Sequence, residues 1–146
     1  MTKSNEYERD LLSLLLCAVP IPNVADNAAS SPITSIWASL HTADPADTGT
    51  QGTSEAAYSG YTRIAVTRST AGFVVSTSNG TASPVAAITF PEAASTSTST
   101  LTHCAFGQAS ATTGGKIFYS GTISPNIAIG SGVTPRLTTQ SSLTED

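Results

Sequence analysis

Charged side chains are scarce in this sequence. Lys and Arg together number six and Asp and Glu ten among 146 residues, which gives a formal net charge of -4. Six cations cannot neutralise enough phosphates to give useful affinity for nucleic acid, and they give as little attraction to an acidic membrane surface. We therefore expect neither nucleic acid nor a membrane as a partner.

Long hydrophobic runs are missing as well. The most apolar stretch, residues 11–19, is far shorter than the roughly 20 residues that a membrane-spanning helix needs. The residues before it carry three acids and two bases, whereas a secretory leader begins with a net positive charge. Of the two cysteines, Cys17 and Cys104, we expect both to be reduced and apolar, because nothing indicates an oxidising compartment.

Motifs that carry catalysis or cofactor binding are also lacking. The sequence holds no G-x-S-x-G, no H-E-x-x-H, no C-x-x-C and no phosphate-binding glycine loop before a helix. His41 and Asp44 supply at most two metal ligands where a site needs three or four, and Asp44 before Pro45 is typical of an Asx turn. We therefore expect the protein not to be an enzyme and to have no catalytic residue, metal or cofactor. A hydrolase built on His41 or His103 is a third alternative, after the two virion roles given below.

Hydroxyl side chains and short alternating segments are what the chain has instead. It contains 21 Ser and 23 Thr, and stretches of period two are separated by Gly, Pro, Ser and Thr. This pattern predicts a mainly β protein, an antiparallel β-sandwich or barrel of about seven or eight short strands with one N-terminal α-helix. The strands are expected at 33–40, 61–68, 72–75, 85–90, 100–108, 116–123, 126–129 and 136–143, with 61–68 and 72–75 forming a hairpin.

The helix is expected to begin near residue 5. Asn5, with Glu8 three residues later, resembles a capping box, and Ser4 or Thr2 are alternative caps. The VPIPN sequence at 19–23 ends the helix, because proline cannot donate to its hydrogen bonds. We divide the chain into 1–32, the helix and a linker arm that includes 23–32, and 33–146, the β domain with Trp37 as a core anchor.

An apolar stripe runs along the predicted helix, and residues 12 and 16 widen it. Such a helix must be buried, either on its own domain or on a neighbouring protein, and the sequence leaves both alternatives open. The stripe consists of Tyr7, Leu11, Leu14 and Leu15.

The central block carries a resemblance to a known family. Its most specific stretches are SLHTADP at 39–45 and TSEAAYSGYTRIAV at 53–66, followed by AAITFPEA, THCAFG, KIFYSGTIS and SGVTPRL. Over most of its length the chain resembles small tailed-phage virion proteins that are often labelled tail fibre proteins. The resemblance implies a phage structural protein but not whether the head or the tail carries it.

Two locations in the virion follow from this resemblance. A chain of 146 residues without internal repeats cannot build a fibre shaft, whereas a compact β domain with an apolar anchor suits a capsid decoration (cement) protein. We expect a homotrimer on the capsid surface that binds across major capsid protein subunits, with the host cytoplasm as its location during assembly. The alternative is a tail- or fibre-associated adhesin that binds a host receptor, with Trp37 as a further stacking candidate. The expected partner-binding residues are Tyr7, Leu11, Leu14, Leu15, His41, Asp44, Tyr58 and Tyr61.

Overall fold

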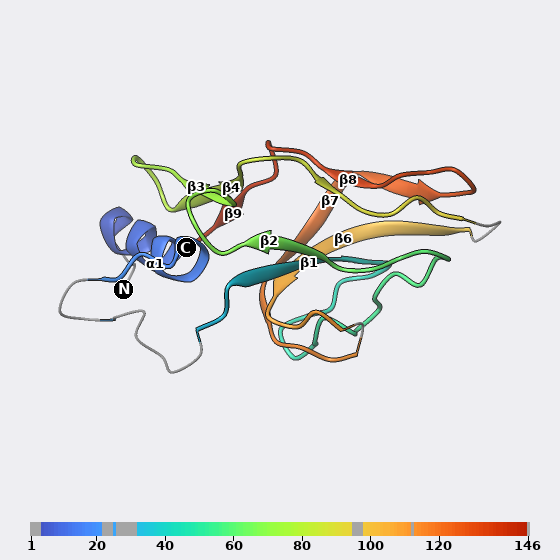
Figure 1. Cartoon of the computed structure of the whole chain (residues 1–146), viewed down its shortest axis with the longest axis horizontal. Helices are drawn as coiled ribbons and strands as arrows, with labels where there is room; N and C mark the ends of the chain where they lie inside the picture. The colour runs from blue at the N-terminus through green and yellow to red at the C-terminus, as the bar shows by residue number, and fades with distance from the viewer. Residues whose placement is uncertain (1–3, 22–24, 26–31, 95–97, 112, 146) are drawn as a thin grey trace. The chain divides into compact units, whose positions relative to one another are not determined.

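The chain folds into two compact units. The computed structural model describes residues 4–21, 25, 32–94, 98–111 and 113–145 (Figure 1). Unit 1 comprises Met1–Ser35, Thr67–Ala87 and Leu137–Asp146, and unit 2 comprises Ile36–Val66 and Ile88–Arg136. Each unit thus combines segments that are distant in sequence. Of the predicted linker at 23–32, only residues 25 and 32 are among those described, and the division at residue 32 stays a prediction.

Unit 1 is built from one helix and a small sheet. The helix α1 (Asn5–Cys17) contacts β3 (Phe73–Val75) and β4 (Thr81–Pro84), as Figure 1 shows. The sheet order is β3-β4-β9, with β9 at Leu143–Thr144, and both pairings are antiparallel. The inward residues of these strands, which include Phe73, Ala82 and Leu143, are buried and form the floor on which α1 packs.

Both ends of α1 follow from local capping. Ser4 is the N-cap, since its hydroxyl accepts a hydrogen bond from the Tyr7 backbone N–H at 3.3 Å. At the other end Ala18 is left-handed and the Val19 N–H donates to the Ser13 carbonyl, so the helix has already ended before Pro20.

A guanidinium group from outside the helix satisfies its last carbonyls. The final turn of α1 has no basic residue of its own. Arg68 instead donates from Nε to the Leu15 carbonyl and from Nη2 to the Leu14 carbonyl, both at 2.6 Å, and from Nη1 to the Ile33 carbonyl at 3.3 Å. A cation at this position also complements the negative end of the helix dipole. Arg68 therefore fixes the end of α1 within unit 1.

Unit 2 is built around one four-stranded sheet in the order β2-β1-β6-β7. Its strands are β1 (Ser35–His41), β2 (Ile64–Thr67), β6 (Ser99–Gly107) and β7 (Ile117–Ile129). The pairings of β1 with β6 and of β6 with β7 are antiparallel. A two-stranded sheet joins β5 (Ile88–Thr89) to β8 (Arg136–Leu137). The core of unit 2 includes Ile36, Ala38, Leu40, Phe90, Leu101 and Ala105.

The predicted fold class is confirmed. The described residues form nine strands in antiparallel sheets with one N-terminal helix, and none of these sheets closes into a barrel, so the sandwich is the consistent alternative. Both cysteines are free, Cys17 buried and Cys104 half-buried. No helix in the described part of the chain is long and apolar enough to span a membrane.

Three strand predictions were wrong. The predicted strand at 136–143 is two short strands, β8 and β9, which belong to different sheets. The segment 61–68 does not pair with 72–75, because β2 adjoins β1 while β3 pairs with β4. The reason is local: the Ser69 carbonyl accepts from the N–H groups of Gly72 and Phe73, and the Arg68 N–H donates to the Thr34 carbonyl. The predicted strands at 116–123 and 126–129 are one strand, β7, whose register with β6 shifts between Leu101 and His103.

We predict that Arg68→Met destabilises the protein by about 1.5–3 kcal/mol, because helix carbonyls lose charge-assisted hydrogen bonds while the side-chain length is kept. Thermal or urea unfolding measures the change, with Arg136→Met at an exposed position as the control. Equal stability of the two variants would show that the cap at the end of α1 contributes nothing.

Candidate functional site

The apolar residues of the helix α1 are covered to different extents. Leu12 and Leu16 are fully buried. The predicted stripe is less completely covered: Tyr7 is 43% exposed, and Leu11, Leu14 and Leu15 are each half-buried. We call these four residues the helix face. Leaving a second apolar stripe in contact with water is unfavourable, and this identifies the helix face as a candidate interaction surface.

The other large exposed hydrophobic residues also belong to unit 1. Among the described residues they are Val19, Ile33, Val74 and Val85, at 39–56% exposure. Val74 pairs with Ser83 across β3 and β4, and the Val85 N–H donates to the Gly72 carbonyl one step further along. Val74 and Val85 therefore share the outer face of this hairpin, opposite the buried Phe73. The exposed apolar surface is concentrated in unit 1.

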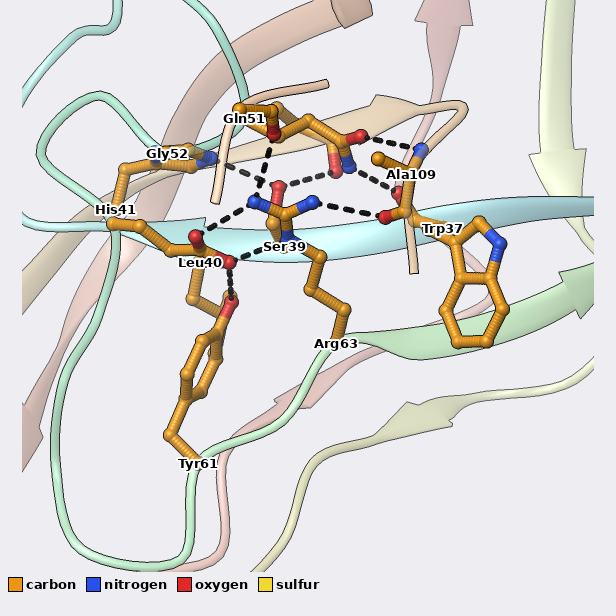
Figure 2. Close-up of polar contacts among 12 residues, drawn as sticks. Trp37, Ser39, Leu40, His41, Gln51, Gly52, Tyr61, Arg63 and Ala109 are labelled. Atoms are coloured by element: carbon orange, nitrogen blue, oxygen red, sulfur yellow. Dashed lines mark hydrogen bonds and ion pairs between the residues drawn. The ribbon is translucent and has the colours of Figure 1, made fainter. Parts of the chain in front are cut away.

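In unit 2 the loop 42–60 is fastened by a buried ion pair. Arg63, immediately before β2, donates from Nε to Glu55 Oε1 at 2.7 Å and from Nη2 to Glu55 Oε2 at 2.8 Å. The two side chains are 0% and 6% exposed. The guanidinium also donates to the carbonyls of Ala109, at 2.9 Å, and Gly114, at 3.1 Å, as Figure 2 shows for Ala109. One cation thus joins the loop 42–60 to the loop 108–116.

Gln51 makes a second link between the same loops. Its side chain is fully buried, donates from Nε2 to the Trp37 carbonyl and accepts from the Ala109 N–H at Oε1, both at 3.0 Å (Figure 2). Its backbone N–H donates to the Gly115 carbonyl. A Cβ atom at Gly107 would overlap the Gln51 side chain, which explains the glycine at the end of β6. Trp37, the predicted core anchor, is half-buried.

The two predicted tyrosines face inward. The Tyr58 hydroxyl donates to the Pro91 carbonyl at 2.9 Å, and burial raises the Tyr58 pKa to about 12. The Tyr61 hydroxyl donates to Glu55 and accepts from the Leu40 N–H, and burial, together with the Glu55 carboxylate, raises its pKa. Tyr58 is only 4% exposed, so its ring belongs to the core. A role for either tyrosine in partner binding stays a prediction.

His41 is fully buried and uses both ring nitrogens. Nε2 lies 2.9 Å from the Ser39 hydroxyl and Nδ1 lies 2.8 Å from the Thr53 carbonyl (Figure 2 shows the Ser39 side). This matches the hydrogen-bonding pattern of a nucleophile and its base, yet both side chains are 0% exposed and offer no surface to a substrate. Burial lowers the pKa of His41, so the ring is neutral near pH 7 and serves to hold the loop residue Thr53.

Asp44 lies on the surface of the same loop. Its Oδ1 accepts from the Ala46 N–H at 2.9 Å, which confirms the predicted Asx turn. Among the described residues, no group of three or more His, Cys, Asp and Glu side chains is placed to hold a metal ion. The structure therefore separates the predicted binding residues into two sets, the helix face of unit 1 and the loop residues of unit 2, with His41 and Tyr58 buried and Asp44 exposed.

Four residues that organise these surfaces were missed from the sequence: Gln51, Glu55, Arg63 and Arg68. The sequence held one signal for this. Arg63, one of its few charged residues, lies directly before the alternating residues Ile64 and Val66, and an unpaired cation there would be buried. The partners of Arg63 are 8 to 51 residues away in two loops, and that arrangement has no local signature.

The fold defines a small, mainly β protein with one N-terminal helix. The family model described as podophage GP4 fiber I protein gp80 matches residues 21–144, so the chain belongs to this family. It is therefore a phage virion structural protein of a family labelled as fibre proteins, and the predicted resemblance is confirmed. The match begins at Ile21, so α1 precedes it. A search of the curated proteins gave no match.

We predict that Glu55→Gln destabilises the protein by about 3–5 kcal/mol, because the buried Arg63 cation loses its counter-charge. The exposed Glu92→Gln is the matched control, and urea unfolding is the measurement. A loss below about 1 kcal/mol for Glu55→Gln would contradict the ion pair's role in fastening the loops.

Acid should weaken unit 2 through His41. Its folded pKa lies below the ordinary 6.5, so the unfolded state binds the proton first and stability is lost as pH falls below 6.5 towards the folded pKa. As pH falls below 6.5, the free energy of unfolding should fall by up to about 1.4 kcal/mol per pH unit more in the wild type than in His41→Gln. Parallel pH profiles for the two proteins would show that His41 does not contribute.

Proposed function

We propose that this chain is a non-enzymatic subunit of the phage particle that docks on a larger virion protein through the helix face. The observation that carries the proposal is the apolar stripe of α1 that is not fully buried: Tyr7 is exposed and Leu11, Leu14 and Leu15 keep some exposed surface, although Leu12 and Leu16 already anchor the helix. Because the two stripes are distinct, occupation of the outer one by a partner requires no unfolding of unit 1.

The energy available from the helix face fits such a role. Burial of apolar surface is worth about 25 cal/mol per Å², so covering the remaining exposed surface of three leucines and one tyrosine supplies a few kcal/mol for each copy. That is weak for an isolated complex, but many copies on one particle act together. The remainder of the chain, which is rich in hydroxyl groups and poor in charge, adds no strong attraction to other partners.

Our first candidate location for the subunit is the fibre assembly of the virion. The family description names a fibre protein, and the matched residues 21–144 include all nine described strands. The chain has no internal repeat that would form a shaft, so we infer a compact piece attached to a fibre or to its base. The helix face, which lies outside the family match, then attaches the β units to the rest of the assembly.

The second candidate is capsid decoration. Two compact units, one of which carries an apolar helix as an anchor, suit a cement protein. Such a protein would bind as a homotrimer across neighbouring major capsid protein subunits on the capsid surface. In either location the action is passive. The buried state of the Ser39 and His41 pair supports a role without catalysis.

Imaging of virions decides between the two locations. A tagged copy of the full chain, incorporated into particles and labelled with gold, should appear at the tail fibres under the first candidate. Label distributed over the head shell would overturn the fibre location and support capsid decoration. Label on neither, with the chain absent from purified particles, would contradict both.

We predict that Leu14→Asp lowers occupancy on particles by roughly tenfold or more, because a charge on the helix face must be desolvated at the interface. The free energy of unfolding of the Leu14→Asp variant should change by only about 1 kcal/mol or less, since Leu14 is half-buried. Leu12→Asp should instead fail to fold. Copies bound per particle are counted after mixing purified chain with particles that lack it.

The exposed Thr138→Asp, also in unit 1, is the matched control for added negative charge. If Leu14→Asp occupies particles as fully as Thr138→Asp does, the helix face is not the docking surface.

A further inference from the structure

The turn between β3 and β4 in unit 1 contains an Asn-Gly pair, Asn79 and Gly80. Asn79 is the only one of the five asparagines in the sequence that is followed by glycine. The backbone nitrogen after an asparagine can attack the side-chain amide carbon Cγ, because the two atoms close a five-membered ring. Glycine at the second position leaves this attack unhindered, since it has no side chain. The pair is therefore a candidate site of self-modification.

Close packing in unit 1 requires the glycine of this pair. A Cβ atom at position 80 would lie 2.6 Å from Oε2 of Glu8 and 2.8 Å from the carbonyl oxygen of Glu145. Gly80 is buried, and its own carbonyl accepts a hydrogen bond from the Glu145 N–H at 2.8 Å. The fold thus keeps a residue without a side chain directly after Asn79.

The carboxylate of Glu8 lies close to the attacking nitrogen. A Cβ atom is about 2.5 Å from the backbone nitrogen of its own residue, so Glu8 Oε2 is within about 5 Å of the Gly80 nitrogen. A general base acts over such a distance through one water molecule. Among the described residues, no acceptor is bonded to the Gly80 N–H. Glu8 is therefore placed to take this proton.

The side-chain amide of Asn79 is polarised by a neighbouring hydroxyl. Thr81, the first residue of β4, donates from Oγ1 to Asn79 Oδ1 at 2.7 Å, and its backbone N–H donates to the Asn79 carbonyl at 2.9 Å. When a nitrogen attacks Cγ, negative charge develops on Oδ1. A donor aimed at that oxygen stabilises the tetrahedral intermediate, as an oxyanion hole does. Asn79 is exposed, so water reaches the reacting amide.

We propose that Asn79 deamidates in the folded chain, with Glu8 as general base and the Thr81 hydroxyl as oxyanion donor. The Glu8 carboxylate takes the proton of the Gly80 N–H while the Gly80 nitrogen forms a bond to Asn79 Cγ. The bond between Cγ and the side-chain nitrogen then breaks, and the proton held by Glu8 leaves with that nitrogen as ammonia. The product is a succinimide ring that joins residues 79 and 80.

Water opens the ring and completes the reaction. Addition at Cγ breaks the new bond and leaves aspartate in an ordinary backbone. Addition at the backbone carbonyl carbon gives isoaspartate, in which the chain continues through Cγ and is longer by one methylene group. In both cases the net change is hydrolysis of one amide to a carboxylate and ammonia, so water is the only co-reactant.

The modification alters the turn against which α1 packs. Either product adds a negative charge next to the residue that contacts Glu8, and like charges at short range repel. Isoaspartate also lengthens the backbone where Gly80 has no spare room. Because α1 contacts both β3 and β4, the modified chain is less stable than the original one. This change does not depend on the helix face or on any partner.

The test follows Asn79 in the full chain during incubation at neutral pH, by peptide mapping with mass spectrometry. Wild type should deamidate several times faster than a synthetic peptide of residues 76–82, which lacks Glu8. Glu8→Gln should slow the reaction by roughly tenfold or more, because positioned general bases contribute that much or more. Glu6→Gln, exposed on the same helix, is the matched control and should react like wild type. The exposed Asn126, followed by isoleucine, is the internal reference in each digest.

Two further variants separate the roles of the groups. Glu8→Asp keeps a carboxylate and should retain more of the rate than Glu8→Gln. Thr81→Val removes the hydroxyl but keeps the branched side chain and the backbone N–H, and it should also slow the reaction. Thermal unfolding of each variant shows whether the fold is kept, and the separated deamidated fraction of wild type should have a lower midpoint.

Several results would overturn the proposal. A wild type that deamidates no faster than the peptide would show that the fold does not promote the reaction. Equal rates for Glu8→Gln and Glu6→Gln would exclude Glu8 as the base, and a wild-type rate in Thr81→Val would exclude the oxyanion donor. An unchanged midpoint in the deamidated fraction would contradict the effect on unit 1.

Discussion

A buried guanidinium in unit 2 has to be paired, and much of that unit is arranged to pair it. Arg63 is fully buried, and its donors reach Glu55 on one loop and two carbonyls on another. An isolated cation in this position would cost several kcal/mol, so the loops have to keep these partners in place for the unit to be stable. Gln51 and His41 fasten the same loop at further points, and this explains how a long loop without regular structure is held in one conformation.

Some of the few charged side chains are used inside the fold, and this leaves fewer charges for the surface. Two of the six cations, Arg63 and Arg68, are engaged with loops and with the end of α1. What the surface offers is hydroxyl groups and, in unit 1, exposed apolar residues. A surface with few charges suits recognition by shape and apolar contact, the mode that we propose for the helix face.

Local pattern predicted the elements, and distant contacts decided how they pair. The helix, the strand expected at 100–108 and found at 99–107, and the Asx turn at Asp44 each depend on neighbouring residues, and these predictions are confirmed. The predicted hairpin of 61–68 with 72–75 was wrong because the turn after Arg68 closes on itself. The sequence also did not show which stripe of the helix faces inward: both stripes are rich in leucine, and the choice is made by β3 and β4.

The central claim is that the outer stripe of α1 is covered when the protein is in the virion. Hydroxyl-radical footprinting of the isolated chain and of intact particles measures this directly, residue by residue. The account predicts that Tyr7, Leu11 and Leu14 lose most of their reactivity in the particle, while Leu12 is unreactive in both states. Equal reactivity of Tyr7 and Leu14 in the free chain and in the particle would contradict it.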